Sequence, residues 1–408
     1  MNKCRACGAE LATEIINLKK SPPSNAYLPY KKRYSPEVAY PLIVMLCECC
    51  YLVQTVDFTS AENLFDNNYA YLSSTSTTWL LHSQKFVDQV VEAEDLNEQS
   101  FVVELASNDG YLLNFFENKN IPNLGIEPTA STAIIAMEKG IDVIQDFFSF
   151  SLSEQISRSY GHADLIIANN VYAHVPDIVD FTKGICKLLA TEGVVSIEFP
   201  HLLNLIKYNQ FDTIYHEHFS YLSLTAVQYI FKKCDLKIIN VEEIDTHGGS
   251  LRVWGAKYKS ARPVSETVID MLEVELIAGL KEKSFYSDFK LAVDKIKIDF
   301  LAFLIDAKKK GEVTVGYGAA AKGNTLLNFC GIDDDLITLI FDNSLEKQGK
   351  ISPGSNIPIQ PLSDCNQYRI DNVIIFPWNI KEELKASFSS VYSNPVKYYI
   401  AVPELKMI

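Results

Sequence analysis

The feature that most constrains the fold is an alternation of short buried apolar runs with turns and helical stretches through the middle of the chain. Apolar runs of strand length begin near residues 101, 124, 140, 163 and 193, and a turn follows each of them. Such alternation predicts an α/β fold with a mostly parallel sheet and helices on both faces. In sheets of this kind ligands bind beyond the carboxyl ends of the strands, so functional residues are expected in the turns that follow these runs.

A second α/β unit is predicted nearer the C-terminus. Residues 263–310 have a helical pattern, and a strand, a glycine-containing turn and a helix follow over 313–328. A chain of 408 residues is too long for one compact core and is expected to form two or three domains. The predicted units are a small N-terminal domain over 1–70, a central α/β domain over 71–262 and a C-terminal Rossmann-like α/β domain over 263–408.

Composition is ordinary for a globular protein and excludes some classes of partner. The 37 Lys and Arg against 51 Asp and Glu give a net charge of −14, which argues against nucleic acid or an anionic membrane as a general partner. No run of about 18 apolar residues is present, so no membrane-spanning helix is expected. The first residues hold no apolar stretch resembling a signal peptide, and nine cysteines that include CxxC pairs fit a reducing compartment. The expected location is therefore the cytoplasm.

Two pairs of cysteines near the N-terminus have the spacing of a metal site. Cys4 and Cys7 form one CxxC turn, and Cys47 and Cys50 form the other. Each turn places two thiolates on one side of a tight loop, and two such turns complete a tetrahedral Zn²⁺ site with no open position. A structural zinc-binding domain over 1–70 is therefore predicted. The alternative is four reduced thiols without a metal.

The first turn of the central domain favours S-adenosylmethionine over a dinucleotide. The strand there carries Glu104 and lacks the G-x-G-x-x-G pattern that cradles a pyrophosphate. A carboxylate at this place suits a cationic amino-acid moiety, and Glu127, after the next strand, is placed for the ribose hydroxyls. Glu104, Asp109 and Glu127 together predict an S-adenosylmethionine site, although acids that merely cap helices are the alternative. The other residues of this turn assigned to the cofactor are Ala106, Asn108 and Gly110.

Two later turns of the same domain supply further candidates. Asp146 ends the third predicted strand and is placed for a contact with the adenine edge. Asn170 and His174 follow the fourth strand, at the edge of the sheet where ligands bind, and are candidates for contact with cofactor or substrate. The ordinary role of a lone histidine is structural, and only its location favours a functional role for His174.

The segment Tyr215-His-Glu-His-Phe-Ser-Tyr221 concentrates proton-transfer groups in a chain with seven His. It follows the fifth predicted strand of the cofactor domain, where a catalytic loop is expected. Tyr, His and Glu are the residue types that remove a proton from a carbon acid and hold the resulting oxyanion. The candidates are Tyr215, Glu217, His218 and Tyr221. A satisfied polar turn, or another metal site, is the alternative.

The C-terminal unit contains a possible anion site. In Gly316-Tyr-Gly318-Ala-Ala-Ala-Lys322-Gly, small residues allow close approach of backbone N–H groups, and Lys322 adds a positive charge. Gly318 and Lys322 are therefore predicted to bind a phosphate-bearing substrate. A glycine turn alone is a weak indication, and the alternative is a structural Rossmann-like repeat without a ligand.

Taken together, these motifs resemble the nucleotide-sugar C-methyltransferases, which use S-adenosylmethionine to methylate carbon 3 of nucleoside-diphosphate-linked 4-keto-deoxysugars. The motifs that carry the resemblance span nearly the whole chain: the four-cysteine set, Glu-Leu-Ala-Ser-Asn-Asp-Gly, Tyr-His-Glu-His-Phe-Ser-Tyr, His-Gly-Gly-Ser-Leu-Arg and Gly-Tyr-Gly-Ala-Ala-Ala-Lys-Gly. The family's organisation implies a zinc-binding domain, a methyltransferase domain and a C-terminal domain that helps to bind the nucleotide sugar. One departure is Ala106, where many methyltransferases carry Gly.

The resemblance implies a mechanism. The 4-keto group acidifies the neighbouring carbon, and His218 acts as the general base that removes its proton. Tyr215, Glu217 and His174 shape the sugar pocket, and Tyr215 or His174 holds the enolate oxygen. The resemblance also implies that a tyrosine from Tyr69 or Tyr71 completes the pocket. The expected partner is the sugar nucleotide, bound by a monomer or a weak homo-oligomer.

Two other classes of function fit parts of the sequence. A small-molecule O- or N-methyltransferase on a similar cofactor domain would not need the carbon-acid residues or the second α/β domain. A non-catalytic zinc protein that senses a nucleotide or S-adenosylmethionine would bind the cofactor without producing S-adenosylhomocysteine.

Overall fold

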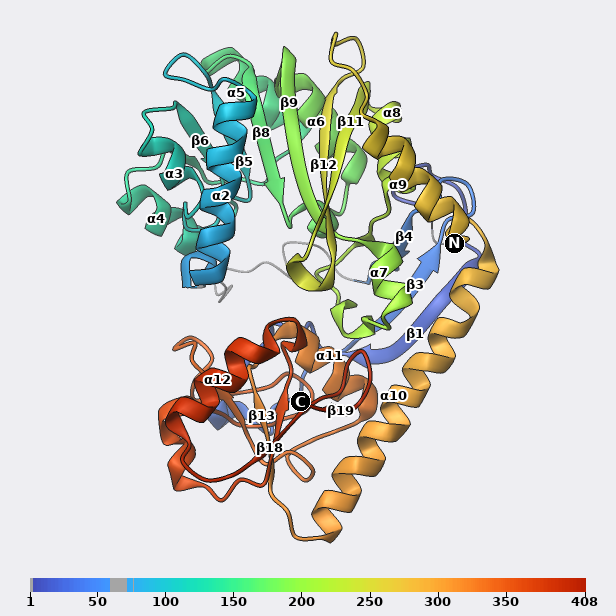
Figure 1. The fold of residues 1–408 in the computed structure, drawn as a ribbon, viewed down its shortest axis with the longest axis vertical. Coiled ribbons are helices and arrows are strands. Elements are labelled where there is room, and N and C mark those ends of the chain that lie inside the picture. Colours follow the sequence, from blue (N-terminus) through green and yellow to red (C-terminus); the bar gives the residue numbers. More distant parts are fainter. Residues whose placement is uncertain (1–2, 59–71, 76) are drawn as a thin grey trace.

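The computed structural model describes residues 3–58, 72–75 and 77–408. It contains a large central sheet, a sheet at the N-terminal side and a C-terminal sheet, with a pair of two-residue strands between the last two. The central and C-terminal sheets lie at opposite ends of the molecule, and the N-terminal strands lie between them (Figure 1).

The central sheet has seven strands. In spatial order they are β11 (Leu236–Ile244), β12 (Ser250–Lys257), β9 (Leu189–Pro200), β8 (Ala163–Asn169), β5 (Val102–Leu105), β6 (Asn123–Ile126) and β7 (Val143–Ile144). β12 is antiparallel to both of its neighbours, and β5 to β9 pair in parallel. The chain runs outward from β5 to β7 and then returns to β8, so the order reverses between β5 and β8, where ligands bind in such sheets. The predicted α/β fold is confirmed, although the third predicted strand is only two residues long.

Helices cover both faces of this sheet because its strands are apolar on both sides. In β5, Val102 packs in the core under one helix layer, and Val103 packs in the core under the other. Successive side chains of a strand point to opposite faces, so an unbroken apolar run requires two layers. The covering helices are α2 (Thr77–Ala93), α3 (Leu113–Glu117) and α4 (Ala130–Glu138) on one face, and α5 (Phe150–Ser159), α6 (Ile178–Leu188), α8 (Leu224–Lys233) and α9 (Glu266–Ile277) on the other.

The N-terminal sheet takes its last strand from the middle of the chain. It is antiparallel, in the order β1 (Thr13–Ser21), β3 (Tyr40–Leu46), β4 (Val53–Thr55) and β10 (Ser220–Tyr221). β10 is the end of the polar cluster that sequence analysis singled out, so that cluster is tied to the N-terminal sheet. A second link joins β2 (Leu28–Pro29) to β15 (Lys350–Ile351) of the C-terminal region.

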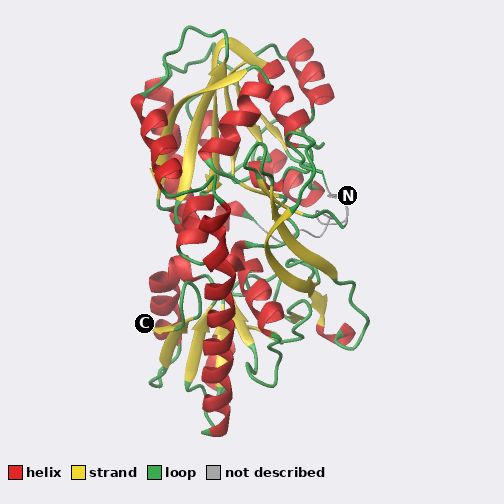
Figure 2. Cartoon of the chain, turned by 90° about the vertical axis from the view of Figure 1, so that its right-hand side faces the viewer, coloured by secondary structure: helices red, strands yellow, loops and turns green. Residues whose placement is uncertain are grey.

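The C-terminal sheet is parallel except for its last strand. Its order is β16 (Ile359–Pro361), β14 (Ile340–Asp342), β13 (Thr314–Tyr317), β17 (Asn372–Ile375), β18 (Lys397–Ile400) and β19 (Lys406–Met407), with α11 (Ala321–Cys330) and α12 (Lys381–Val391) packed against it. The long helix α10 (Lys283–Lys309) runs along one side of the molecule from the N-terminal sheet to this domain (Figures 1 and 2). Its buried face and both sheets contribute to one apolar core, which holds the domains together.

Short helical turns at the edges of the sheets carry several of the residues described below. These are α7 (Leu202–Lys207) and the 3₁₀ turns η1 (Tyr30–Lys32), η2 (Ser73–Thr75), η3 (Tyr172–His174), η4 (Phe211–Thr213), η5 (Thr246–Gly248), η6 (Leu362–Gln367) and η7 (Trp378–Ile380). Within the described residues, no helix combines the length and the apolar character needed to cross a membrane.

Candidate functional site

The ring of His218 lies among three aromatic side chains. Its centroid is 3.9 Å from that of Tyr215, 4.6 Å from that of His174 and 6.2 Å from that of Tyr221. His174 comes from η3, which follows β8. Tyr215 and His218 come from the loop between η4 and β10, and Tyr221 is in β10 itself. The structure therefore brings together four of the predicted site residues from two segments of the chain at the carboxyl edge of the central sheet.

Backbone carbonyls determine which nitrogen of each histidine carries the proton. Nδ1 of His218 lies 2.8 Å from the carbonyl oxygen of Thr213, and Nδ1 of His174 lies 2.8 Å from that of Glu217. A carbonyl oxygen can only accept a hydrogen bond, so Nδ1–H must donate in both rings. Nε2 of each neutral ring therefore holds the lone pair and can accept a proton or a hydrogen bond.

Both imidazoles are held neutral. Burial lowers the pKa of His218 well below its usual value, and the neighbouring His174 lowers it further. Burial lowers the pKa of His174 to about 4, against the effect of its hydrogen bond to the Glu217 carbonyl. Near pH 7 both rings are thus in the form that can accept a proton.

Glu217 faces the same region but is held by the N-terminal domain. Its Oε1 accepts hydrogen bonds from the backbone and side-chain N–H groups of Asn25, at 3.2 and 3.1 Å. Its Oε2 is buried and makes no hydrogen bond within the described residues. Burial raises the pKa of the Glu217 carboxyl. Buried polar atoms without partners are uncommon and indicate a bound group at this place.

The other histidine of the cluster, His216, contacts the N-terminal sheet. Nε2 of His216 lies 3.2 Å from the carbonyl oxygen of Tyr40 in β3, and its ring packs edge-on against that of Tyr40. The alternative of a structural polar turn therefore applies to His216. The alternative of another metal site finds no support in the described part of the chain, where the only group with metal-ligand geometry is the four-cysteine set.

Lys322 of the C-terminal domain lies across from this cluster. Its Nζ is 2.8 Å from Oδ1 of Asn379 and 4.6 Å from the ring centroid of Trp378. Trp378 in turn donates its indole N–H to Oδ2 of the buried Asp212, at 2.7 Å. Burial raises the pKa of Asp212 to about 6, although Lys322 and Trp378 both act against that rise. The charge of Lys322 also helps to lower the pKa of His218.

The turn that contains Gly318 is already occupied by protein groups. The backbone N–H of Gly318 donates to Phe341, and that of Ala319 donates to Oδ2 of Asp342 at 2.6 Å. A Cβ at position 318 would lie 2.6 Å from Cδ of Pro377, so glycine is needed there for packing. Of the two predicted phosphate ligands, Lys322 faces the site, whereas the amide of Gly318 is committed to the sheet.

The three acids assigned to S-adenosylmethionine come together at the carboxyl ends of β5 and β6. Burial raises the pKa of Glu104 well above its usual value, and the charges of Glu127 and Asp109 raise it further. Oε2 of Glu104 and Oδ1 of Asp109 are buried and have no partner within the described residues. The carboxylate of Glu127 accepts the N–H groups of Asn108 and Thr129, at 2.9 and 2.8 Å. Unpartnered carboxylate oxygens fit a ligand that carries an ammonium group and hydroxyls.

The turn between β5 and α3 has the tight shape expected of a cofactor turn. Ala106, Asn108 and Gly110 have φ of 56°, 52° and 72°. A Cβ at position 110 would lie 3.1 Å from Ala136. Asn170, at the end of β8, has φ of 54°, and its Nδ2 is buried without a partner in the described residues. Apart from Asp146, the predicted cofactor residues therefore lie on β5 and in the turns after β5, β6 and β8, around the switch point of the sheet.

One predicted residue lies apart from these groups. Asp146 is exposed at the end of the edge strand β7, where its Oδ1 accepts the N–H of Phe147. Tyr69 and Tyr71 lie outside the described residues.

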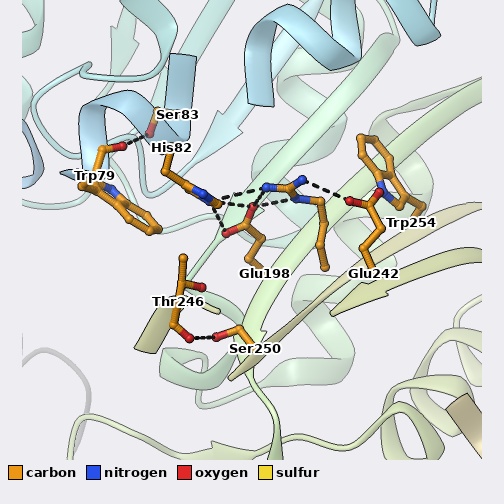
Figure 3. A network of polar contacts seen from close by, with 9 residues as sticks. Trp79, His82, Ser83, Glu198, Glu242, Thr246, Ser250 and Trp254 are labelled. Carbon is orange, nitrogen blue, oxygen red and sulfur yellow. Dashed lines mark hydrogen bonds and ion pairs between the residues drawn. The ribbon is translucent and has the colours of Figure 1, made fainter. Parts of the chain in front are cut away.

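Sequence analysis did not find a buried charge network beside the site. Glu198, at the end of β9, is completely buried, and its Oε1 accepts the Nε–H of Arg252 at 2.7 Å. His82 of α2 lies 3.1 Å from Oε2 of Glu198, and Glu242 binds both Arg252 and the indole N–H of Trp254 (Figure 3). No local pattern could indicate this network, because its members are up to 170 residues apart.

Aromatic rings extend from this network to η5. The ring of Trp79 stacks on His82 at 4.9 Å and lies 5.6 Å from that of His247 in η5. A Cβ at Gly248 would lie 2.4 Å from the ring of Trp378, so this turn lets the two domains approach closely. His247 begins the His-Gly-Gly-Ser-Leu-Arg motif, for which the sequence predicted no role.

The four predicted cysteines lie together. Their sulfur atoms are all within 4.8 Å of one another, with 3.5 Å between Cys4 and Cys50 and 3.4 Å between Cys7 and Cys47. Zn–S bonds of about 2.3 Å in a tetrahedron would place the sulfurs about 3.8 Å apart. The four thiols thus fit a structural Zn²⁺, and Cys49 is exposed.

Acid is expected to destabilise the folded protein from about pH 6.5 downward. Burial lowers the pKa of His174 and of His247 to about 4. As the pH is lowered through about 6.5, the histidines of the unfolded chain take up protons while the buried rings of the folded protein stay neutral. The unfolded state therefore binds more protons, and the free energy of unfolding decreases as the pH decreases. Urea midpoints measured between pH 7 and 5 test this. His247→Asn, which keeps a residue that tolerates the φ of 56°, should flatten the pH dependence. A midpoint independent of pH would contradict the expectation.

Comparison with known proteins identifies the family. The chain is 31% identical over 408 residues to the C-methyltransferase NovU of Streptomyces niveus, and the match covers 100% of this chain and 97% of that protein. This chain belongs to the C-methyltransferase family. Family models for a zinc binding domain, a methyltransferase domain and a C-methyltransferase C-terminal domain match residues 4–65, 81–241 and 245–403. The enzyme is thus an S-adenosylmethionine-dependent C-methyltransferase with a zinc-binding N-terminal domain.

Solved structures of other methyltransferases are more distant. One from Anabaena variabilis is 14% identical, with a TM-score of 0.38, and covers 49% of this chain and 96% of its own. The magnesium protoporphyrin IX methyltransferase of Synechocystis is 13% identical, with a TM-score of 0.32, and covers 43% of this chain and 79% of its own. The assignment to the family depends on the curated relative and the family models alone.

Proposed function

We propose that this C-methyltransferase methylates carbon 3 of a nucleoside-diphosphate-linked 4-keto-deoxysugar, with His218 as the general base. The observation that carries the proposal is the buried imidazole of His218, whose Nδ1–H is anchored to the Thr213 carbonyl and whose Nε2 holds the lone pair. A ketone acidifies the hydrogen on its neighbouring carbon, and a positioned neutral imidazole is suited to remove it. We also propose that the domains extend over residues 1–70, 71–262 and 263–408 and that the enzyme is located in the cytoplasm.

The groups around His218 support this role. Once His218 has taken up a proton, the face of the Tyr215 ring at 3.9 Å stabilises the imidazolium by a cation–π contact. The neutral His174 carries its proton on Nδ1, so its Nε2 can accept a hydrogen bond from a sugar hydroxyl but cannot donate to an enolate oxygen. This favours Tyr215 over His174 as the donor that stabilises the enolate oxygen.

Two other sets of residues complete the assignment. Glu104, Asp109 and Glu127 hold S-adenosylmethionine, and the unpartnered oxygens of Glu104 and Asp109 match its amino and hydroxyl groups. When it is bound, this cofactor supplies an electrophilic methyl group. Lys322, on the opposite domain beside Trp378, is the cation available to the diphosphate.

The test is incubation of the purified enzyme with S-adenosylmethionine and a panel of thymidine, guanosine and cytidine diphosphate 4-keto-deoxysugars, followed by mass spectrometry. One of them should gain a methyl group on carbon. Without the methyl donor, the same sugar should exchange its carbon-3 hydrogen in deuterated water. A methyl group on oxygen or nitrogen, or carbon methylation without solvent exchange, would contradict the proposal.

A further inference from the structure

Arg5 links the zinc-binding turn to the candidate active site. It stands between the ligands Cys4 and Cys7, and its backbone N–H donates to the side chain of Gln54 at 3.0 Å. Its side chain is only 6% exposed, which is unusual for arginine and requires partners for the guanidinium group. Those partners come from three other segments of the chain.

The guanidinium group contacts both loops that carry the site histidines. Its Nη1 donates to the carbonyl oxygen of Pro176, two residues after His174, at 2.8 Å. Its Cζ lies over the ring of Phe219, the residue after His218, 5.2 Å from the centroid. Its Nη2 donates to the carbonyl oxygen of Thr55 in β4, at 3.2 Å. The planar fork of arginine suits such convergence of two carbonyls and an aromatic face, which a lysine cannot reproduce.

The two loops are also joined to each other and to β4. The N–H of Phe219 donates to Ala173 at 2.8 Å, and the N–H of Thr55 donates to Phe219 at 3.1 Å. The hydroxyl of Thr55 lies 3.3 Å from the carbonyl oxygen of His218. Through these contacts Arg5 is linked to the backbone next to both His174 and His218.

We propose that Arg5 is a positioning residue, through which the zinc-binding domain sets the relative placement of His174 and His218. The inference rests on the proposed role of His218, and it gives the zinc site a part in methyl transfer without any contact with the substrate. A base displaced by about 1 Å can lose about 10²-fold in rate. Loss of Arg5 is therefore expected to lower kcat, while the cofactor turns after β5 and β6, which the Arg5 side chain does not contact, should be unaffected.

The test compares Arg5→Ala and Arg5→Lys with the intact enzyme. Both variants should retain one zinc per chain and bind S-adenosylmethionine within about twofold of the wild-type Kd. The kcat of Arg5→Ala should fall by about 10–10²-fold with little change in KM. That of Arg5→Lys should fall less, because lysine keeps the charge and can donate to a carbonyl but lacks the planar fork that spans two carbonyls and the face of Phe219. A merely structural role would change thermal stability and zinc content rather than kcat alone.

Two controls distinguish the loss of the Arg5 contacts with Pro176, Thr55 and Phe219 from a general effect of charge. Asp57→Asn removes the half-exposed ion pair with Arg5 but leaves the contacts with Pro176, Thr55 and Phe219, and should leave kcat within about twofold. Arg158→Ala removes an arginine on α5 that is 73% exposed and pairs with Glu154, so it should leave kcat unchanged. A wild-type kcat in a zinc-loaded Arg5→Ala variant would overturn the proposal. If Arg5→Ala does not fold, a wild-type kcat in Arg5→Lys would do so.

A second measurement does not depend on the substrate. In enzyme labelled with ¹³C-histidine, the Cε1–H resonances of His174 and His218, assigned with single substitutions, should both move in Arg5→Lys and stay in place in Asp57→Asn. Unmoved resonances would overturn the role of Arg5 whatever the substrate is. Moved resonances in an enzyme that methylates no keto sugar would uphold Arg5 as the positioning residue and reject the proposed function alone.

Discussion

Replacing His218 by asparagine is expected to slow methyl transfer by about 10²–10⁴-fold, the usual contribution of a positioned general base. Asparagine has no group that takes up a proton at neutral pH, so both methyl transfer and exchange of the carbon-3 hydrogen with solvent should be lost together. The Kd for S-adenosylmethionine, measured by calorimetry, should change by less than about twofold, because the cofactor acids belong to another part of the sheet edge.

A matched control is His162→Asn. This imidazole is exposed before β8, and its Nδ1 contacts the carbonyl oxygen of Leu188, so its loss should leave the rate unchanged. An unchanged rate in His218→Asn would remove His218 from the mechanism. Retained solvent exchange with lost transfer would show instead that another group removes the proton.

Replacing Arg252 by methionine is expected to lower the free energy of unfolding by about 3–5 kcal/mol, because it leaves a completely buried carboxylate without its main partner. Burial alone would raise the pKa of Glu198, but His82 and Arg252 outweigh burial and lower it. Glu198 is therefore charged in the folded protein at neutral pH. Urea unfolding at pH 7, followed by the fluorescence of Trp79 and Trp254 beside the network, measures the effect.

The double variant Glu198→Gln/Arg252→Met distinguishes a lost charge pair from lost packing. It removes the buried charge along with its partner, so about half or more of the stability should return. Arg158→Met is the matched control, since its ion pair with Glu154 is exposed and should contribute less than about 0.5 kcal/mol. Equal losses in the single and double variants would contradict an electrostatic origin.

The sequence predicted those parts of the site that depend on neighbours in the chain. Cys4 lies beside Cys7, and Cys47 beside Cys50, because each CxxC turn is itself a local structure, and the paired turns are the pattern that predicted the four-cysteine set. The turn after β5 also forms from local residues, with positive φ at Ala106, Asn108 and Gly110. Likewise, His218 lies within a few residues of Tyr215 and Tyr221, so no distant fold was needed to bring these groups close.

Other expectations depended on groups that the sequence could not place. His216 and His218 have the same chemistry and are two residues apart, yet His216 contacts the backbone of Tyr40 and only His218 joins His174. The glycine turn at Gly318 has the composition of a phosphate site, but Asp342 takes the amide of Ala319. The composition of a loop indicates which polar groups it contains. The contacts of that loop with the rest of the protein decide which of these groups can still bind a ligand.

Sequence patterns alone were enough to predict the α/β class, the four-cysteine set and the Tyr215–Tyr221 cluster, because periodicity and short spacing are local properties of a chain. Long-range packing then joins β10 to the N-terminal sheet, Trp378 to Asp212 and Arg5 to the ring of Phe219. An apolar or polar pattern indicates that a face must be covered or a charge paired, but it does not identify the partner. The partner comes from a segment that is distant in the sequence, and no local pattern records which segment that is.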